Sequence, residues 1–465
     1  MYKRQSQEDV NNSGNGNNVS VGFESMLNAT TAVATTAIGS SAIGDGTLTG
    51  DFNTVVGYLS GMDLTSGYDN VLVGAEAGTN LTTGFGNIAV GKEALETSPD
   101  GIHNTAIGYQ TLQDYNDGST NGHNTAVGSR SQLQATTGEF NTSLGSLSMG
   151  SGVTTGDNNV AVGYSAGLAL TSGTENTLVG ANAGDALTTG THNTAVGKNA
   201  LTTETNRGKN TAIGTSALQL LNSGAQGYNT AVGSEAGVAM TTGVQNTIVG
   251  ANAGDTINTG AHNTFVGYKA GDLNTTGSNN TFVGELAGDA NVGGGDLTAI
   301  GKHADFTGAS FSNAISIGYN ASNNIGSNTT VIGNTTVVKA HVHGLVKPIV
   351  RVTAAIAAGA VFTNTIYHFD DTTARTITLP DAGSYSTGAT FEFIVSANPG
   401  SGVHKIITST VDQLIFGQVI GVDTDSSNAQ AVYIPSAAED PGVTRAINFD
   451  GSTKGIIGSL SLIHI

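Results

Sequence analysis

The chain contains no cysteine, which excludes disulfide bonds and thiolate metal sites. Cysteine usage therefore does not indicate whether the protein works in an oxidising or a reducing compartment. Basic residues are also scarce, at 16 against 35 acidic ones. The resulting net charge of −19 argues against a duplex nucleic-acid partner. No apolar run approaches the roughly 18 residues that a membrane span requires, so we expect no membrane insertion. Charged residues make up only 11% of the chain, but regularly spaced apolar positions argue against disorder.

Proline is nearly absent from the first three quarters of the chain, since five of the six prolines lie after residue 347. This change in composition predicts a domain boundary. We expect a repeat domain at 6–335, a transition at 336–347 and a C-terminal β domain at 348–459.

The terminal residues do not fit their surroundings. Residues 1–5 and 460–465 resemble translations of the two strands of one sequencing-library transposon adapter. We therefore expect them to be adapter-derived and the chain to be a fragment from a metagenomic contig, and we set them aside in predicting the fold.

A phrase of the type Asn-Thr-x-Val-Gly dominates the remainder and returns about every 17 residues. A fixed period of this length predicts an all-β solenoid, in which one coil cannot bury its apolar face without its neighbours. The phrase ends at Gly57, Gly74, Gly91, Gly108, Gly128, Gly145, Gly163, Gly180, Gly197, Gly214, Gly233, Gly250, Gly267, Gly284, Gly301 and Gly318.

Each repeat supplies several apolar columns. The aliphatic residue before the glycine, such as Val56 or Val73, is expected to face the core, together with a small residue such as Ala77 and a second apolar residue such as Leu64. Because strand side chains alternate, the mid-strand residue, such as Val55, is then expected to point outward, although it too is apolar. A continuous outward apolar stripe predicts packing of chains, most simply as a homotrimer. The alternative is a monomer that aggregates or whose stripe is covered by a lid.

The asparagine at the start of each phrase forms another column. Stacked asparagines can hydrogen-bond amide to amide or satisfy the backbone of turns, so a structural role is expected. The column contains Asn53, Asn70, Asn87, Asn104, Asn124, Asn141, Asn159, Asn176, Asn193, Asn210, Asn229, Asn246, Asn263 and Asn280.

The phrase Asn104-Thr105-Ala106-Ile107-Gly108 and its copy at 210–214 are similar to the Asn-Ser-x-Ala-Ile-Gly repeat of the YadA-type heads of trimeric autotransporter adhesins. The resemblance covers about residues 18–335. It implies a left-handed parallel β-roll, three chains to a head, and adhesion as the function; related repeats also occur in bacteriophage tail fibres. The 17-residue coil is longer than the family's, and no binding residue carries over.

These observations predict a non-enzymatic attachment rod about 85 Å long, outside the cell or on a virion, that binds a cell-surface glycan or protein. Both a phage tail fibre and a bacterial surface adhesin fit this prediction. Receptor contacts are expected just after the strand glycine, where tyrosines could alternatively form a stacked surface ladder. The candidates are Tyr58, Tyr109, Tyr164, Tyr268 and Tyr319, with Lys92, Lys198 and Lys302 interspersed.

Histidines offer the one candidate metal site. His341 and His343 share a strand face, and a trimer would bring several imidazoles together there; the alternative is a simple transition strand. Four other histidines precede repeat asparagines and are expected to be solvated edge residues: His103, His123, His192 and His262. No cofactor is otherwise expected.

Residues 345–459 lose the period and alternate as short strands at 375–379, 391–395 and 404–408, which predicts an antiparallel β-sandwich or trimer-forming domain. The acidic pairs Asp370-Asp371 and Glu439-Asp440 lie in turn-like contexts, and the Gly293-Gly294-Gly295 run lacks the lysine of a phosphate loop. An enzyme acting on polysaccharide would need its site outside this fragment. Ice binding is disfavoured, because the strand threonine is expected to face inward.

Overall fold

A computed structural model describes residues 16–334, except 117–121, 223, 225–226 and 309, with their side chains, and nine later strands as backbone only. The chain divides into two compact units, Met1–Ala340 and His341–Ile465. Each unit is treated by itself below.

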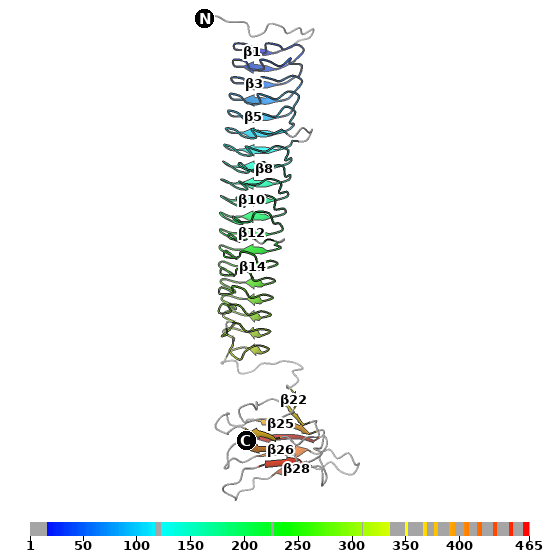
Figure 1. The fold of residues 1–465 in the computed structure, drawn as a ribbon, viewed down its shortest axis with the longest axis vertical. Coiled ribbons are helices and arrows are strands. Elements are labelled where there is room, and N and C mark those ends of the chain that lie inside the picture. The colour runs from blue at the N-terminus through cyan, green and yellow to red at the C-terminus, as the bar shows by residue number, and fades with distance from the viewer. Residues whose placement is uncertain are drawn as a thin grey trace, which may run out of the picture. The chain divides into compact units, whose positions relative to one another are not determined.

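The first unit is a parallel β-solenoid, which confirms the all-β repeat architecture predicted from the period (Figure 1). Each coil contributes one three-residue strand, and consecutive strands pair in parallel and in register, as Thr54 with Val71. The nineteen strands of this sheet are β1 (Val19–Val21), β2 (Thr36–Ile38), β3 (Thr54–Val56), β4 (Val71–Val73), β5 (Ile88–Val90), β6 (Thr105–Ile107), β7 (Thr125–Val127), β8 (Thr142–Leu144), β9 (Val160–Val162), β10 (Thr177–Val179), β11 (Thr194–Val196), β12 (Thr211–Ile213), β13 (Thr230–Val232), β14 (Thr247–Val249), β15 (Thr264–Val266), β16 (Thr281–Val283), β17 (Thr298–Ile300), β19 (Ile315–Ile317) and β21 (Thr330–Ile332). A small second sheet pairs β18 (Asp305–Phe306) with β20 (Ser322–Asn323).

A glycine follows every strand of the large sheet, and at nearly all of these positions the next coil approaches closely. Gly57 has φ +151°, and a Cβ on it would lie 2.1 Å from the carbonyl oxygen of Gly74 in the next coil. The same near-collision recurs at every strand-final glycine from Gly22 to Gly301. Both the positive φ and the lack of space therefore require glycine.

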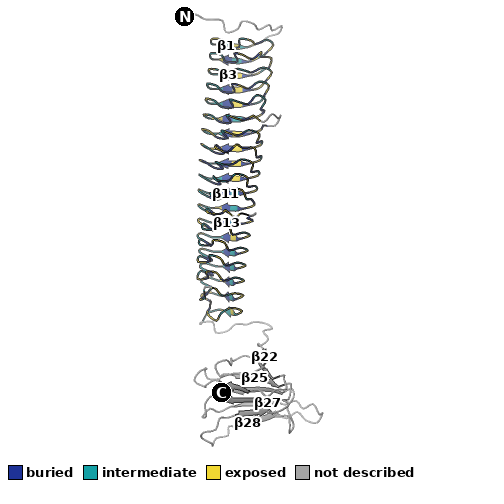
Figure 2. Cartoon of the chain, in the orientation of Figure 1, coloured by how far each residue is buried: buried dark blue, intermediate teal, exposed yellow. Residues whose placement is uncertain are grey.

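The core lies inside the coil, between the strand and the opposite turns (Figure 2). Three columns fill it, and they are represented by Val55 in mid-strand, Ala77 after the glycine turn and Leu64 on the far side, all without solvent exposure. The small and second apolar columns lie where the sequence predicted them.

The mid-strand column was predicted to face outward, and that prediction is wrong. Val55, Leu72 and Phe265 are fully buried, whereas the aliphatic residues before the glycine are half-buried or exposed, as Ile107 is at 38%. The asparagine column explains the reversal. Asn70 is buried and lies two residues before Leu72, so strand alternation turns both side chains inward and leaves Val71 and Val73 outside.

The asparagine column is a continuous hydrogen-bonded ladder, as predicted. The Oδ1 of Asn159 accepts bonds from both the backbone N–H and the Nδ2 of Asn176, at 3.0 Å each. The Nδ2 of Asn176 also donates to the carbonyl of Gly190, at 2.8 Å. The chain of bonds from Oδ1 to the next backbone N–H runs unbroken from Asn53 to Leu297.

Polar side chains divide the core into two apolar clusters. One cluster runs from Met26 to Ala135 and the other from Met149 to Ala321. Between them, Gln132 donates from Nε2 to the Oγ of Ser143 at 3.0 Å, and both residues are fully buried. Ser143 lies in mid-strand of β8, between Ala126 and Ala161 in the neighbouring coils.

The second unit contains two sheets. Six strands form one of them, in the order β22 (Ile349–Arg351), β23 (Ile366–Phe369), β25 (Thr390–Val395), β30 (Ser459–His464), β27 (Phe416–Ile420) and β28 (Ala431–Ile434); the other is β24 (Thr376–Leu379), β26 (His404–Thr408) and β29 (Ala446–Phe449). The three strands predicted from alternation correspond to β24, β25 and β26. Their pairing is mixed rather than purely antiparallel, since β24 and β26 are parallel. β30 includes most of the C-terminal residues that we set aside as adapter-derived.

Candidate attachment surfaces

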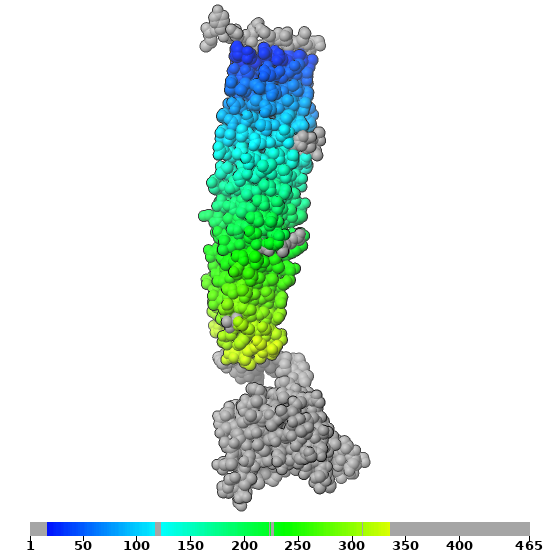
Figure 3. Space-filling view, in the orientation of Figure 1, coloured from blue at the N-terminus to red at the C-terminus, as the bar shows by residue number. Residues whose placement is uncertain are grey.

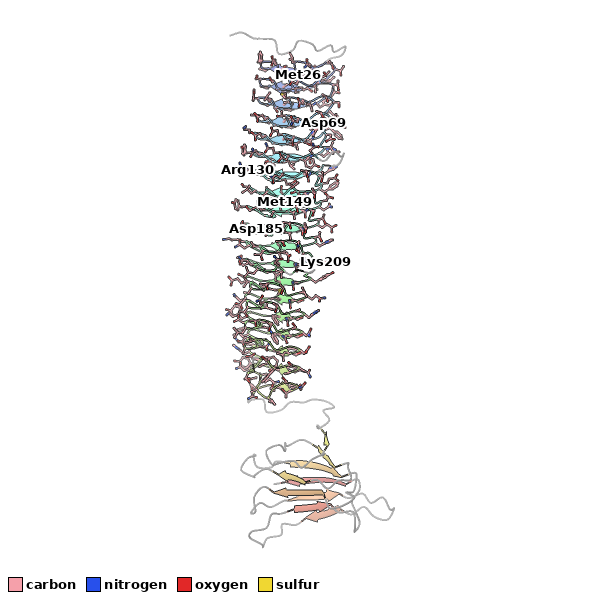
Figure 4. All side chains as sticks on the ribbon, viewed as in Figure 1. Met26, Asp69, Arg130, Met149, Asp185 and Lys209 are labelled. Carbon is pink, nitrogen blue, oxygen red and sulfur yellow. The ribbon has the colours of Figure 1, made fainter. Side chains whose placement is uncertain are left out.

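The exposed aromatic residues of the described solenoid gather at the two borders of the strand. One border is the position just after the strand-final glycine, where Tyr58 and Tyr109 lie. The other is the pair of positions just before the asparagine, where Phe140 and Tyr228 lie. Figure 4 labels Lys209, at the second border, and Arg130, two residues after Gly128, and shows them projecting on opposite sides of the strands. We call the strand residues between these borders the strand face.

The predicted tyrosines form the first border and are all exposed. No two of them lie in adjacent coils, because Tyr58 and Tyr109 are three coils apart. The tyrosines therefore do not stack on one another as a ladder. Their exposed fractions are 54% for Tyr58, 41% for Tyr109, 56% for Tyr164, 49% for Tyr268 and 61% for Tyr319.

The predicted lysines occupy the same border. The Nζ of Lys92 lies 2.5 Å from a carboxylate oxygen of Glu93, and the Nζ of Lys302 lies 3.0 Å from Glu285 in the preceding coil. Lys198 is exposed. Arg130, which the sequence did not single out, places its guanidinium carbon 5.8 Å from the ring centroid of Tyr109.

A run of five stacked rings occupies the second border over consecutive coils. Tyr68 and Phe85 stack with centroids 4.6 Å apart, Phe85 meets His103 edge-on at 5.2 Å, and His123 stacks on Phe140 at 5.2 Å. His103 and His123 join the two halves at 5.1 Å. Both histidines are exposed, as predicted, but they belong to this aromatic run and are not scattered. Alignment on the glycine hid the run because its members shift by one coil position after Phe85.

The strand face consists of two outward columns, one of which is mainly threonine. The strand threonine was predicted to face inward, and this is wrong: Thr54 and Thr177 are exposed. Every outward strand residue of the nineteen strands is threonine, valine or isoleucine except Leu144, and none is charged. On the face drawn in Figure 3, the described coils form a continuous surface along the stack, from blue to yellow.

Carboxylates from successive coils crowd together near the C-terminal end of the solenoid. Burial raises the pKa of Asp255 to about 7, and a hydrogen bond with Asp272 in the next coil adds to the shift. Burial likewise raises the pKa of Asp305 to about 7, with repulsion from Asp289 contributing. Lys269 lies 3.1 Å from Asp272 and compensates part of this charge.

The described residues contain no group of three or more histidines or acids that could hold a metal ion. The candidate ligands His341 and His343 lie outside the described residues, as do the side chains of the acidic pairs at 370–371 and 439–440. His192 approaches Glu175 at 2.7 Å, and His262 is exposed. The part of the chain that the structure describes has no helix long and apolar enough to cross a membrane.

No family model, curated protein or solved structure matches this chain.

Proposed function

We propose that this chain is a non-enzymatic attachment rod that works outside the cell, as part of a phage tail fibre or a bacterial surface adhesin. Its receptor is a cell-surface glycan or protein. The observation that carries the proposal is the distribution of exposed aromatic residues. Among the described residues of the solenoid, the exposed rings are confined to the two borders of the strand face, outside the columns that build the core.

Tyrosine suits this role because one rigid side chain offers both apolar area and a hydroxyl. Tyr58, Tyr109 and Tyr164 recur at intervals of three coils, or roughly 14 Å at the usual strand spacing. A receptor with repeating units, such as a surface polysaccharide, could meet several of these rings at once. Weak single contacts would then add up to firm attachment.

The resemblance to adhesin heads supports the same function and a homotrimeric state. In such an assembly each copy would present its own borders, which multiplies the contacts again. We place the two-sheet C-terminal unit in the role of a trimer-forming β-sandwich-like domain.

Adsorption of the labelled full chain to candidate host cells tests the proposal. Alanine at Tyr58, Tyr109, Tyr164, Tyr268 and Tyr319 together should lower adsorption at least tenfold. Leu220→Ala with Leu273→Ala is the control and should leave adsorption unchanged, because these side chains are 47% and 49% exposed but lie in turns away from both borders. Equal adsorption by the wild-type chain and the five-alanine variant would show that the tyrosines do not contribute to receptor binding. Failure of the wild-type chain to adsorb to any cell of its source community would count against attachment itself.

A further inference from the structure

We propose that the strand face is the surface on which copies of this chain pack against one another. In this arrangement each coil of one copy lies at the same height along the stack as a coil of the other, and we call such copies level. The inference extends the proposed attachment rod, but it is tested without any receptor. The sequence predicted that the mid-strand residues form the contact between chains. Because the structure places those residues in the core of a single chain, the strand face takes over that role.

The chemistry of the strand face is that of an interface core. Its outward side chains carry no charge, although the chain as a whole has 51 charged residues. The second outward column is aliphatic throughout and includes Ile107, Leu144 and Ile300, with 38–49% of their surface exposed. Burying such side chains away from water is favourable, and depletion of charge is what distinguishes interface cores from other surface.

The shape of the side chains favours packing as well. Threonine, valine and isoleucine have few χ1 rotamers, so they lose little conformational entropy when a partner covers them. The charged pairs lie at the borders instead, with Glu175 and His192 on one side and Lys302 and Glu285 on the other. An uncharged centre with a polar rim is the usual anatomy of a protein–protein contact.

The regular period identifies the partner. The same outward pair of side chains returns at every strand from β1 to β21, one strand spacing apart. Only a partner with an identical axial repeat can make the same contact at every level of the stack. A second copy of this chain has that repeat by construction.

The area is sufficient for a stable contact. Nineteen strands at ~4.8 Å spacing, each about 10 Å long, give a face of roughly 850 Å² per chain. Specific protein–protein interfaces bury about 800 Å² per partner. A face of this size left in water would exceed the apolar patches that most soluble monomers expose.

The first test is the mass of the full chain by sedimentation equilibrium, compared with the 46.6 kDa of one copy. We expect an integer multiple of that mass for the wild type. The triple variant Thr177→Lys, Thr211→Lys and Thr247→Lys adds charge to the strand face and should reduce the mass to that of one copy. The matched control is Thr189→Lys, Thr242→Lys and Thr259→Lys, which adds the same charge at exposed turn threonines and should keep the wild-type mass.

The second test does not depend on disrupting the assembly. The chain lacks cysteine, so Thr177→Cys introduces a single thiol in β10, the middle strand of the sheet. Level copies bring this position together whether they run parallel or antiparallel. A short bis-maleimide should therefore link Thr177→Cys chains in pairs, and should link Thr189→Cys chains at least tenfold less.

A monomeric wild type, or no preferential linking at position 177, would overturn the proposal. A monomer that also shapes ice crystals would show that the threonine array of the strand face meets ice instead of another chain.

Discussion

The side-chain oxygen of Asn53 accepts two hydrogen bonds from Asn70 in the next coil, one from the backbone N–H and one from Nδ2, at 3.1 Å each. A single residue type thus satisfies a backbone donor and the neighbouring side chain at once. Both asparagines are fully buried, so neither group can turn to water when its partner is lost.

Removal of one asparagine should destabilise the solenoid locally. Asn176→Ala leaves the backbone N–H of Asn193 and the carbonyl of Gly190 without their partner. Each buried unsatisfied group costs about 1–3 kcal/mol, so we expect a loss of about 2–4 kcal/mol. Hydrogen exchange of peptides covering 170–200 measures it. Asn206→Ala, at an exposed turn, is the control and should change protection by less than about 0.5 kcal/mol. Similar protection in the two variants would refute a stabilising role for the ladder.

The strand-final glycines should not tolerate alanine. Gly180 has φ +133°, and a Cβ there would lie 2.5 Å from the carbonyl oxygen of Gly197. Strain and collision together should cost Gly180→Ala at least about 1–3 kcal/mol in urea unfolding. In Gly293→Ala the new methyl group meets only the Thr276 hydroxyl, at 3.1 Å, and this side chain can turn away. Equal unfolding midpoints for the two variants would contradict the close approach of the coils.

Stability should fall as pH rises from about 4 to 7. The folded-state pKa of about 7 at Asp255 and Asp305 exceeds the value of an unfolded aspartate, so the folded state holds protons that the unfolded state releases. The stabilising protons are lost as pH passes through the folded-state pKa. We therefore expect a higher melting temperature at pH 5 than at pH 8.

The double variant Asp255→Asn and Asp305→Asn separates this effect from the general relief of negative charge. It should raise the melting temperature at pH 8 by several degrees and flatten the profile between pH 5 and 8. Asp114→Asn, which removes one exposed charge, should leave the slope unchanged. An unchanged slope in the double variant would mean that these two carboxyls do not hold the protons.

The polar coil between the two core clusters should open before its neighbours. Gln132 occupies the coil position held by Leu112 and Met149 in the adjacent coils, with a similar positive φ. Replacing all three bonded polar groups of this coil with apolar ones, as Ser131→Ala, Gln132→Leu and Ser143→Ala, should join the clusters and stabilise this coil by about 1 kcal/mol.

The single variant Ser143→Ala removes the acceptor of a buried amide and should instead destabilise the same coil by about 1–3 kcal/mol. Hydrogen exchange of peptides covering 128–149 distinguishes the two changes. If the amides of the wild-type coil are protected from exchange as strongly as those of its neighbours, the polar division of the core does not lower the local stability.

The period alone predicted the parallel stack, the asparagine ladder and the small column, because each of these needs one residue type at one coil position. The sequence could not assign the two faces of the strand, since Val55 and Val56 are both apolar and a three-residue strand offers little alternation to read. The buried Asn53 decides which face is inside, because Val55 lies two residues after it and therefore points to the same side of the strand. The aromatic run from Tyr68 to Phe140 also escaped, because its rings meet in space while shifting position within the repeat.

The ladder joins each coil only to the one before and the one after it, and every level repeats nearly the same bonds. A coil can therefore be duplicated or deleted as a 17-residue segment without creating a new kind of contact. Unequal recombination can then lengthen or shorten the solenoid in steps of one strand spacing. The length of the solenoid can therefore change between lineages while its cross-section stays the same.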